Sequence, residues 1–81
     1  MKTNTTAIVR IYDRPERVLG KETGKTLWVC ECLEFNPFSA VIGRGYTPDE
    51  AVADFKFRAS HESYAKNYNL TVKIVNNYAA L

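Results

Sequence analysis

The chain has 81 residues, of which 46% are hydrophobic and 25% are charged, a composition that predicts one small globular domain rather than a disordered segment. Its formal net charge of +2 is too small to indicate a nucleic-acid partner, and it also argues against an acidic DNA mimic. No apolar run has the length of a signal peptide or of a membrane span, which needs about 20 residues, so we expect a cytoplasmic protein that does not bind a membrane.

The first strand is expected over residues 7–12, which are rich in β-branched and aromatic side chains. The polar residues 1–6 and the tail 76–81 are expected to be the flexible ends of a single domain that spans residues 1–81. Residues 13–25 mix charged side chains with proline and glycine, which predicts a long, solvated hairpin connection.

The same connection carries basic side chains that are interleaved with the acidic residues Asp13, Glu16 and Glu22. Such a mixture of charges is typical of a solvated loop, which is the favoured interpretation. Contact with nucleic acid is the alternative, and it would use the basic residues Arg14, Arg17, Lys21 and Lys25.

A second strand is expected over residues 26–35, and it ends where Asn36-Pro37-Phe38 turns the chain. A third strand is expected over residues 39–45, in which Gly43 indicates a bulge or a crowded position. Apolar and polar residues alternate over residues 70–74, which predicts a fourth strand with one buried face.

Before the fourth strand the sequence predicts the only long helix, from Pro48 to about Asn67. Thr47 is a good N-cap, Pro48 suits the first helical position, and Glu50 can complete a capping box by accepting the Thr47 N–H. Asn69 is expected to cap the C-terminal end. The predicted fold class is α+β, with the order β-β-β-α-β: a three-stranded antiparallel meander, one long helix packed on the sheet, and a fourth strand joining it.

The predicted helix has two apolar stripes. The stripe expected to pack on the sheet consists of Ala51, Val52, Phe55 and Ala59. The stripe on nearly the opposite side consists of Phe57, His61, Tyr64 and Tyr68. Two interpretations of this second stripe stay open: either the helix ends early and Tyr64 or Tyr68 folds back onto the domain, or the stripe is an aromatic interface for a partner protein or a second copy.

Cys30 and Cys32 lie side by side on one face of the expected second strand, which is poor geometry for a disulfide. We expect core or half-buried cysteines, because a zinc site would need further ligands that only His61 and carboxylates could supply. Glu31 and Glu34 point to opposite faces of a regular strand and do not form an acid–base pair. The sequence has no P-loop, nucleophile elbow or metal-binding histidine pair, so we expect no catalytic residues, no cofactor and no metal.

Residues 28–35 (WVCECLEF) and 45–52 (GYTPDEAV) resemble the HicB antitoxin family, whose members carry an aromatic-led strand with a glutamate and then a Gly-x-Thr-x-x-Glu-Ala helix start at a similar separation. The resemblance covers about residues 7–75. It implies a partial ribonuclease-H-like β-β-β-α-β domain without catalytic carboxylates, which antitoxins use to bind a small toxin ribonuclease. The segment that binds operator DNA in typical members has no counterpart before Leu81, so autoregulation by DNA binding is not expected.

The leading functional prediction is a small non-enzymatic protein-interaction module that resembles a stand-alone HicB-type antitoxin domain from a phage or another mobile element. Its expected partner is another protein, such as a small toxin, or a second copy in a homodimer. The longer loop after Tyr12 departs from the family pattern, so the resemblance assigns no toxin-binding residues. The alternative is a small nucleic-acid-binding domain that uses the basic residues of segment 14–25, and this contact would weaken steeply with salt.

Overall fold

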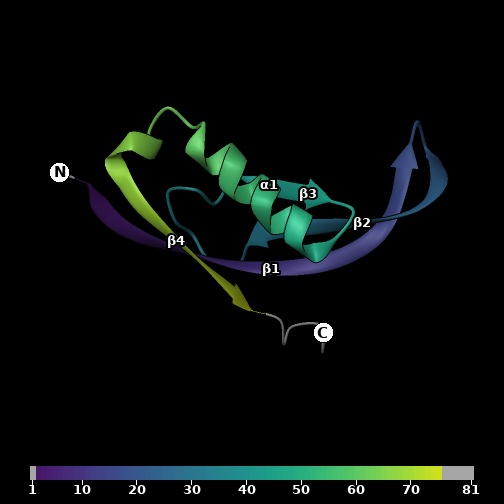
Figure 1. Cartoon of the computed structure of the whole chain (residues 1–81), viewed down its shortest axis with the longest axis horizontal. Coiled ribbons are helices and arrows are strands. Elements are labelled where there is room, and N and C mark those ends of the chain that lie inside the picture. The colour runs from purple at the N-terminus through teal and green to yellow at the C-terminus, as the bar shows by residue number, and fades with distance from the viewer. Residues whose placement is uncertain (1, 76–81) are drawn as a thin grey trace.

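The structure, a computed structural model, describes residues 2–75 as a sheet with a helix packed on one face (Figure 1). The elements are β1 (Thr3–Val18), β2 (Lys21–Cys32), β3 (Ile42–Gly45), α1 (Pro48–Ser60), the 3₁₀ helix η1 (Ala65–Asn67) and β4 (Tyr68–Val75). The tail at 76–81, which was predicted to be flexible, lies outside the described residues.

The four strands form a mixed sheet in the order β3-β2-β1-β4. β1 pairs antiparallel with β2, β2 pairs antiparallel with β3, and β4 lies beside β1 in parallel. The predicted α+β class is confirmed. The sequence predicted a three-stranded antiparallel meander with an added strand, whereas the structure has a single mixed sheet, because the crossover through α1 returns the chain to run in the direction of β1.

β1 and β2 form a much longer hairpin than the sequence predicted. Residues 13–25, expected to be a solvated loop, instead continue both strands up to a turn at Leu19 and Gly20, where φ is 52° and 82°. Positive φ at both positions is the geometry of turns that close tight hairpins. This part of the hairpin projects beyond α1 (Figure 1), so its two faces are solvated and its polar composition is that of a loop.

The first residues of the chain also belong to a strand. Residues 3–6, expected to be frayed, pair with β4 from Tyr68 to Thr71. The Asn69 side chain donates to Asn4 Oδ1 at 3.2 Å across this pair, so the prediction that Asn69 caps the helix is wrong. Backbone pairing with β4 places these polar residues in the sheet, and the three threonines among them have side chains that are common in strands.

α1 lies across β3 and β2 (Figure 1), and glycine allows it to approach β3 closely. A Cβ atom at Gly43 would lie 2.3 Å from the carbonyl oxygen of Ala51, and one at Gly45 would lie 2.4 Å from the Cβ atom of Glu50. The crowded position predicted at Gly43 is therefore confirmed. The buried core consists of Ala7, Val9, Cys30, Phe38, Val41, Ala51, Phe55 and Ala59.

The N-terminal cap of α1 forms at the predicted residue. Thr47 Oγ1 accepts a hydrogen bond from the backbone N–H of Glu50 at 3.1 Å, and Pro48 occupies the first turn. The reciprocal bond differs from the predicted capping box, because Glu50 Oε1 accepts from the backbone N–H of Tyr46 at 3.3 Å rather than from that of Thr47.

Thr47→Ala is expected to lower the free energy of unfolding by about 1 kcal/mol, because the first turn of α1 loses the acceptor for one backbone N–H. Urea denaturation followed by circular dichroism measures the loss. Thr47→Ser keeps the hydroxyl and is the matched control, which should stay close to the parent protein. Equal stability of Thr47→Ala and the parent would contradict a stabilising role of this cap.

α1 ends at Ser60, so the predicted helix end near Asn67 is wrong. The Ser60 hydroxyl donates to the carbonyl oxygen of Phe57 at 2.6 Å, and His61 Nδ1–H donates to the same oxygen at 2.8 Å. Side chains that bond nearby backbone groups compete with the helical hydrogen bonds. The helix therefore stops within this polar stretch, and the chain turns toward η1 and β4.

Candidate functional site: a lysine-lined groove

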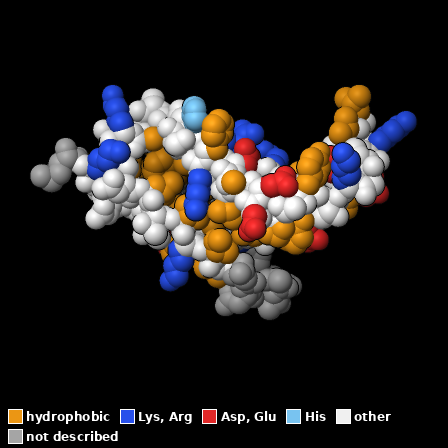
Figure 2. All heavy atoms as spheres, viewed as in Figure 1, with side chains coloured by type: hydrophobic (Ala, Val, Ile, Leu, Met, Phe, Trp, Pro, Cys, Tyr) orange, Lys and Arg blue, Asp and Glu red, His pale blue; other side chains and the backbone are white. Residues whose placement is uncertain are grey.

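A groove of about 590 Å³ opens between the C-terminal half of α1 and β4. It forms because α1 lies over β3 and β2 and leaves the same face of β4 without a helix. Figure 2 shows hydrophobic side chains in this hollow, with blue basic side chains around it. The apolar part of its lining consists of Phe38, Ala59, Ala65, Tyr68, Leu70 and Val72.

Three exposed lysines complete the groove together with Ser60. Lys56 comes from α1, Lys66 from η1, and Lys2 directly precedes β1. Among the described residues that line the groove there is no carboxylate and no imidazole. The lysine-lined groove, as we call this set of lining residues, therefore offers an apolar floor and positive charge to a ligand.

Tyr64 and Tyr68 pack against Phe38, which is 1% exposed, beside this groove. The ring centroid of Phe38 lies 5.2 Å from that of Tyr64 and 5.8 Å from that of Tyr68. Loss of solvent raises the pKa of the Tyr64 hydroxyl above its usual value. The helix thus ends early and both tyrosines fold back onto the domain, which is the first of the two interpretations of the aromatic stripe.

The other two residues of that stripe stay on the outer surface of α1. Phe57 is 62% exposed, and its ring centroid lies 4.3 Å from that of the exposed His61. The structure therefore separates the four predicted interface residues into an exposed pair and a packed pair. A partner contact through Phe57 and His61 stays a prediction.

The basic residues of the hairpin lie among acidic partners. Arg17 Nη2 lies 3.8 Å from Glu22 Oε1, and Lys25 Nζ lies 5.1 Å from the ring centroid of Tyr46. The Tyr46 hydroxyl donates to Glu16 Oε2 at 2.6 Å. Hydrogen bonds from Tyr46 and Thr23 hold the pKa of Glu16 below its usual value, so this carboxylate stays negative beside Lys25 at neutral pH.

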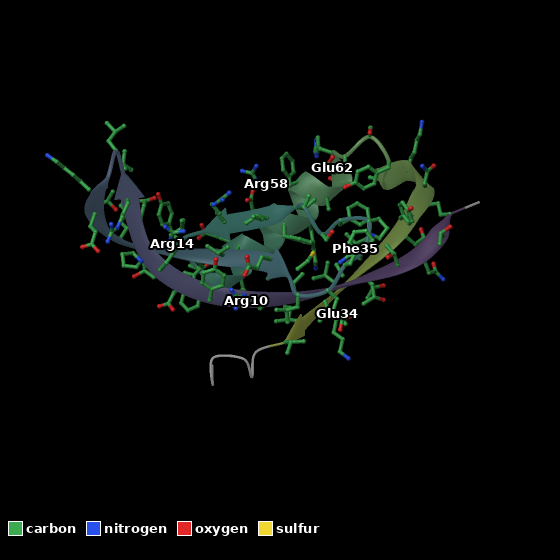
Figure 3. The ribbon with its side chains drawn as sticks, turned by 180° about the vertical axis from the view of Figure 1, so that it is seen from behind. Arg10, Arg14, Glu34, Phe35, Arg58 and Glu62 are labelled. Carbon is green, nitrogen blue, oxygen red and sulfur yellow. The ribbon has the colours of Figure 1, made fainter. Side chains whose placement is uncertain are left out.

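The remaining two predicted nucleic-acid contacts are Arg14 and Lys21. Arg14 lies on β1, as Figure 3 shows from behind the sheet, and it lines a small hollow together with Lys25 and the acidic residues Asp13 and Glu22. Lys21 is exposed at the start of β2, directly after the turn. The four basic residues are thus spread along the ribbon with carboxylates between them, and they do not form a purely positive patch.

Both cysteines are free and lie on the core side of β2, as the sequence predicted. Cys30 is fully buried, and burial raises the pKa of its thiol to about 11, with smaller effects of Cys32 and Glu31. Burial also raises the pKa of Cys32, whose Sγ–H donates to the carbonyl oxygen of Phe38 at 3.5 Å. Thiols that stay protonated at neutral pH are poor nucleophiles and poor metal ligands.

No cluster of three or more histidine, cysteine or acidic side chains suited to a metal ion occurs within residues 2–75. Over the same residues, no helix has the length and apolar character needed to cross a bilayer. Comparison of the chain with family models, curated proteins and solved structures gives no match.

The sequence did not predict the lysine-lined groove. Lys2, Lys56 and Lys66 are far apart in the chain and come together only because β4 pairs with β1 and α1 ends before η1. The alternation that predicted the fourth strand did indicate one apolar face, to which Leu70 and Val72 belong. It held no signal that α1 leaves part of this face open.

Proposed function

We propose that this protein is a small, non-enzymatic protein-interaction module, related to HicB-type antitoxin domains, which binds a partner such as a small toxin in the cytoplasm. The observation that carries the proposal is the lysine-lined groove, whose apolar floor is open to solvent. Apolar surface that a soluble protein leaves open in a concave site is typical of places where another molecule binds.

The proposed relation in fold is to a partial ribonuclease-H-like β-β-β-α-β domain. The order of the four strands and the long helix along the chain supports it. The antiparallel pairing of β2 with both β1 and β3 supports a meander as its first part. Segment 45–52, which carries the family-like motif, contains the capped start of α1.

The chemistry of the groove suits a protein segment with apolar side chains flanked by carboxylates. The apolar side chains would pack on Leu70, Val72 and Tyr68, and the carboxylates would pair with the exposed lysines. The described lining lacks carboxylates and imidazole, the groups that most general acid–base catalysis requires. Binding is therefore the better interpretation of this site than catalysis.

Titration calorimetry with the product of the neighbouring gene in the native host tests the proposal. The double variant Lys56→Glu with Lys66→Glu reverses two charges of the groove and is expected to weaken binding by more than about tenfold. Lys21→Glu with Lys25→Glu makes the same change of net charge on the hairpin and is the matched control, with binding expected to stay at the parent level.

The same two variants test nucleic-acid binding. If the protein binds single-stranded RNA or duplex DNA, with an affinity that falls steeply with salt and is lost in the hairpin variant, the alternative function applies instead. If the neighbouring gene product does not bind the parent protein, or binds the groove variant equally well, the proposed use of the groove is wrong.

A further inference from the structure

β4 is the long free edge of the described sheet. It stands at the end of the strand order, and no strand within residues 2–75 pairs with its outer side. Its 8 residues, YNLTVKIV, include no proline or glycine, and its register with β1 runs without a bulge from Tyr68 to Val75. The opposite edge strand, β3, has only 4 residues. Natural proteins usually shorten, bend or charge such an edge, because its unpaired backbone groups can pair with another chain.

The sequence of β4 is compatible with itself in an antiparallel pair. When a twofold axis perpendicular to the sheet passes through Val72, this residue faces its own copy and Leu70 faces Ile74. Lys73, which carries the single charge of β4, then faces Thr71, so that no like charges oppose each other. Ile74 is 43% exposed in one chain, and this pairing would bring it against Leu70 of the second copy.

We propose that two copies of this chain pair through β4, in antiparallel register about Val72, so that their two four-stranded sheets become one continuous sheet. The twofold axis keeps both helices on the same face. α1 lies over β3 and β2, at the far side of each sheet from the new seam, and leaves the approach to β4 open.

The dimer has a consequence for the lysine-lined groove. Leu70 and Val72 belong both to the groove and to the proposed seam. The two grooves therefore meet across the twofold axis and form one trough with a lysine set at each end. The proposal of a β4 dimer does not depend on the partner suggested above, since its tests use only this chain.

Oxidative cross-linking tests the register. Opposed residues of an antiparallel pair have Cα atoms about 4.5–5.5 Å apart, within the range of a disulfide. Val72→Cys is expected to give a covalent dimer on a non-reducing gel under mild oxidation. Ile74→Cys is the matched control on the same face, because its copies would lie about 14 Å apart along the strands. The parent protein, oxidised in the same way, shows how much cross-linking arises from the native cysteines Cys30 and Cys32. Equal cross-linking at both positions, or at neither, would overturn the register.

Sedimentation equilibrium tests the pairing without cysteine. Thr71 and Lys73 are exposed, so substitutions there leave the monomer core intact. Thr71→Lys sets lysine against Lys73 twice in the dimer and is expected to weaken association roughly two- to thirtyfold, whereas Thr71→Glu is expected to strengthen it to a similar extent. A monomeric mass of the parent protein at the highest concentrations reached, or the same dissociation constant in both variants, would show that β4 is not the seam.

Discussion

Gly43→Ala is expected to lower the free energy of unfolding by about 3 kcal/mol, at the upper end of what overpacking a core usually costs. The added Cβ atom would lie 2.3 Å from the carbonyl oxygen of Ala51 and 2.4 Å from the backbone nitrogen of Phe55. Both contacts are with the backbone of α1, so no side-chain rotation can relieve them. The helix would have to move away from β3, which loosens the core packing that Phe55 makes. Urea denaturation followed by circular dichroism measures the loss.

Gly24→Ala is the control for this substitution. Gly24 lies in the hairpin with a φ of 86°, and nothing lies within 4 Å of the position that a Cβ atom would take. The variant is therefore expected to lose only about 1–2 kcal/mol, the cost of a left-handed backbone for an alanine. A loss at Gly43 no greater than at Gly24 would show that α1 does not rest directly on β3.

Phe55→Ala is expected to lower the free energy of unfolding by about 3–5 kcal/mol, which approaches the whole stability of many small domains. Phe55 is fully buried and is one of the largest side chains of the core. Its loss removes apolar contacts and leaves a cavity in the core between α1 and the sheet. Thermal denaturation is expected to show either a large fall in the melting temperature or no cooperative transition.

Phe57→Ala makes the same chemical change two positions along the same helix. Because Phe57 is 62% exposed, its replacement is expected to change the free energy of unfolding by less than about 0.5 kcal/mol. The pair thus separates the buried side of α1 from its outer side. Similar losses in the two variants would mean that α1 is rotated about its axis relative to the structure.

Local chemistry explains which segments were predictable from the sequence. Thr47 caps α1 because its hydroxyl accepts the Glu50 N–H, and the proline and acidic residues that follow suit the first helical turn. Helical periodicity predicted the core stripe of Ala51, Val52, Phe55 and Ala59, of which Val52 is only partly buried and the other three are fully buried against the sheet. The alternation of side chains along a strand places Cys30 on the same face of β2 as Trp28 and Cys32, and this face packs on the core.

The segments that were predicted wrongly depend on partners distant in the chain. Residues 13–25 pair across a hairpin that contacts little else, so their side chains carry no apolar alternation. Residues 3–6 become a strand only through β4. The end of α1 depends on bonds of Ser60 and His61 to a single carbonyl oxygen, where periodicity would have continued the helix. The lysine-lined groove depends on two of these features, the pairing of residues 3–6 with β4 and the early end of α1.

The parallel pairing of β1 with β4 also imposes an order on folding during synthesis. The hairpin of β1 and β2 is expected to form quickly, because its pairing starts between residues that are close together in the chain. Thr3 and Tyr68 pair only after the long stretch of chain between them has closed into a loop. β4 is the last element of the described sheet to be synthesised, so the position next to β1 stays unfilled until this strand has been made. Leu70 and Val72, which form part of the apolar floor of the lysine-lined groove, are therefore added last. A partner that binds in the groove would therefore bind only those chains whose synthesis has passed β4.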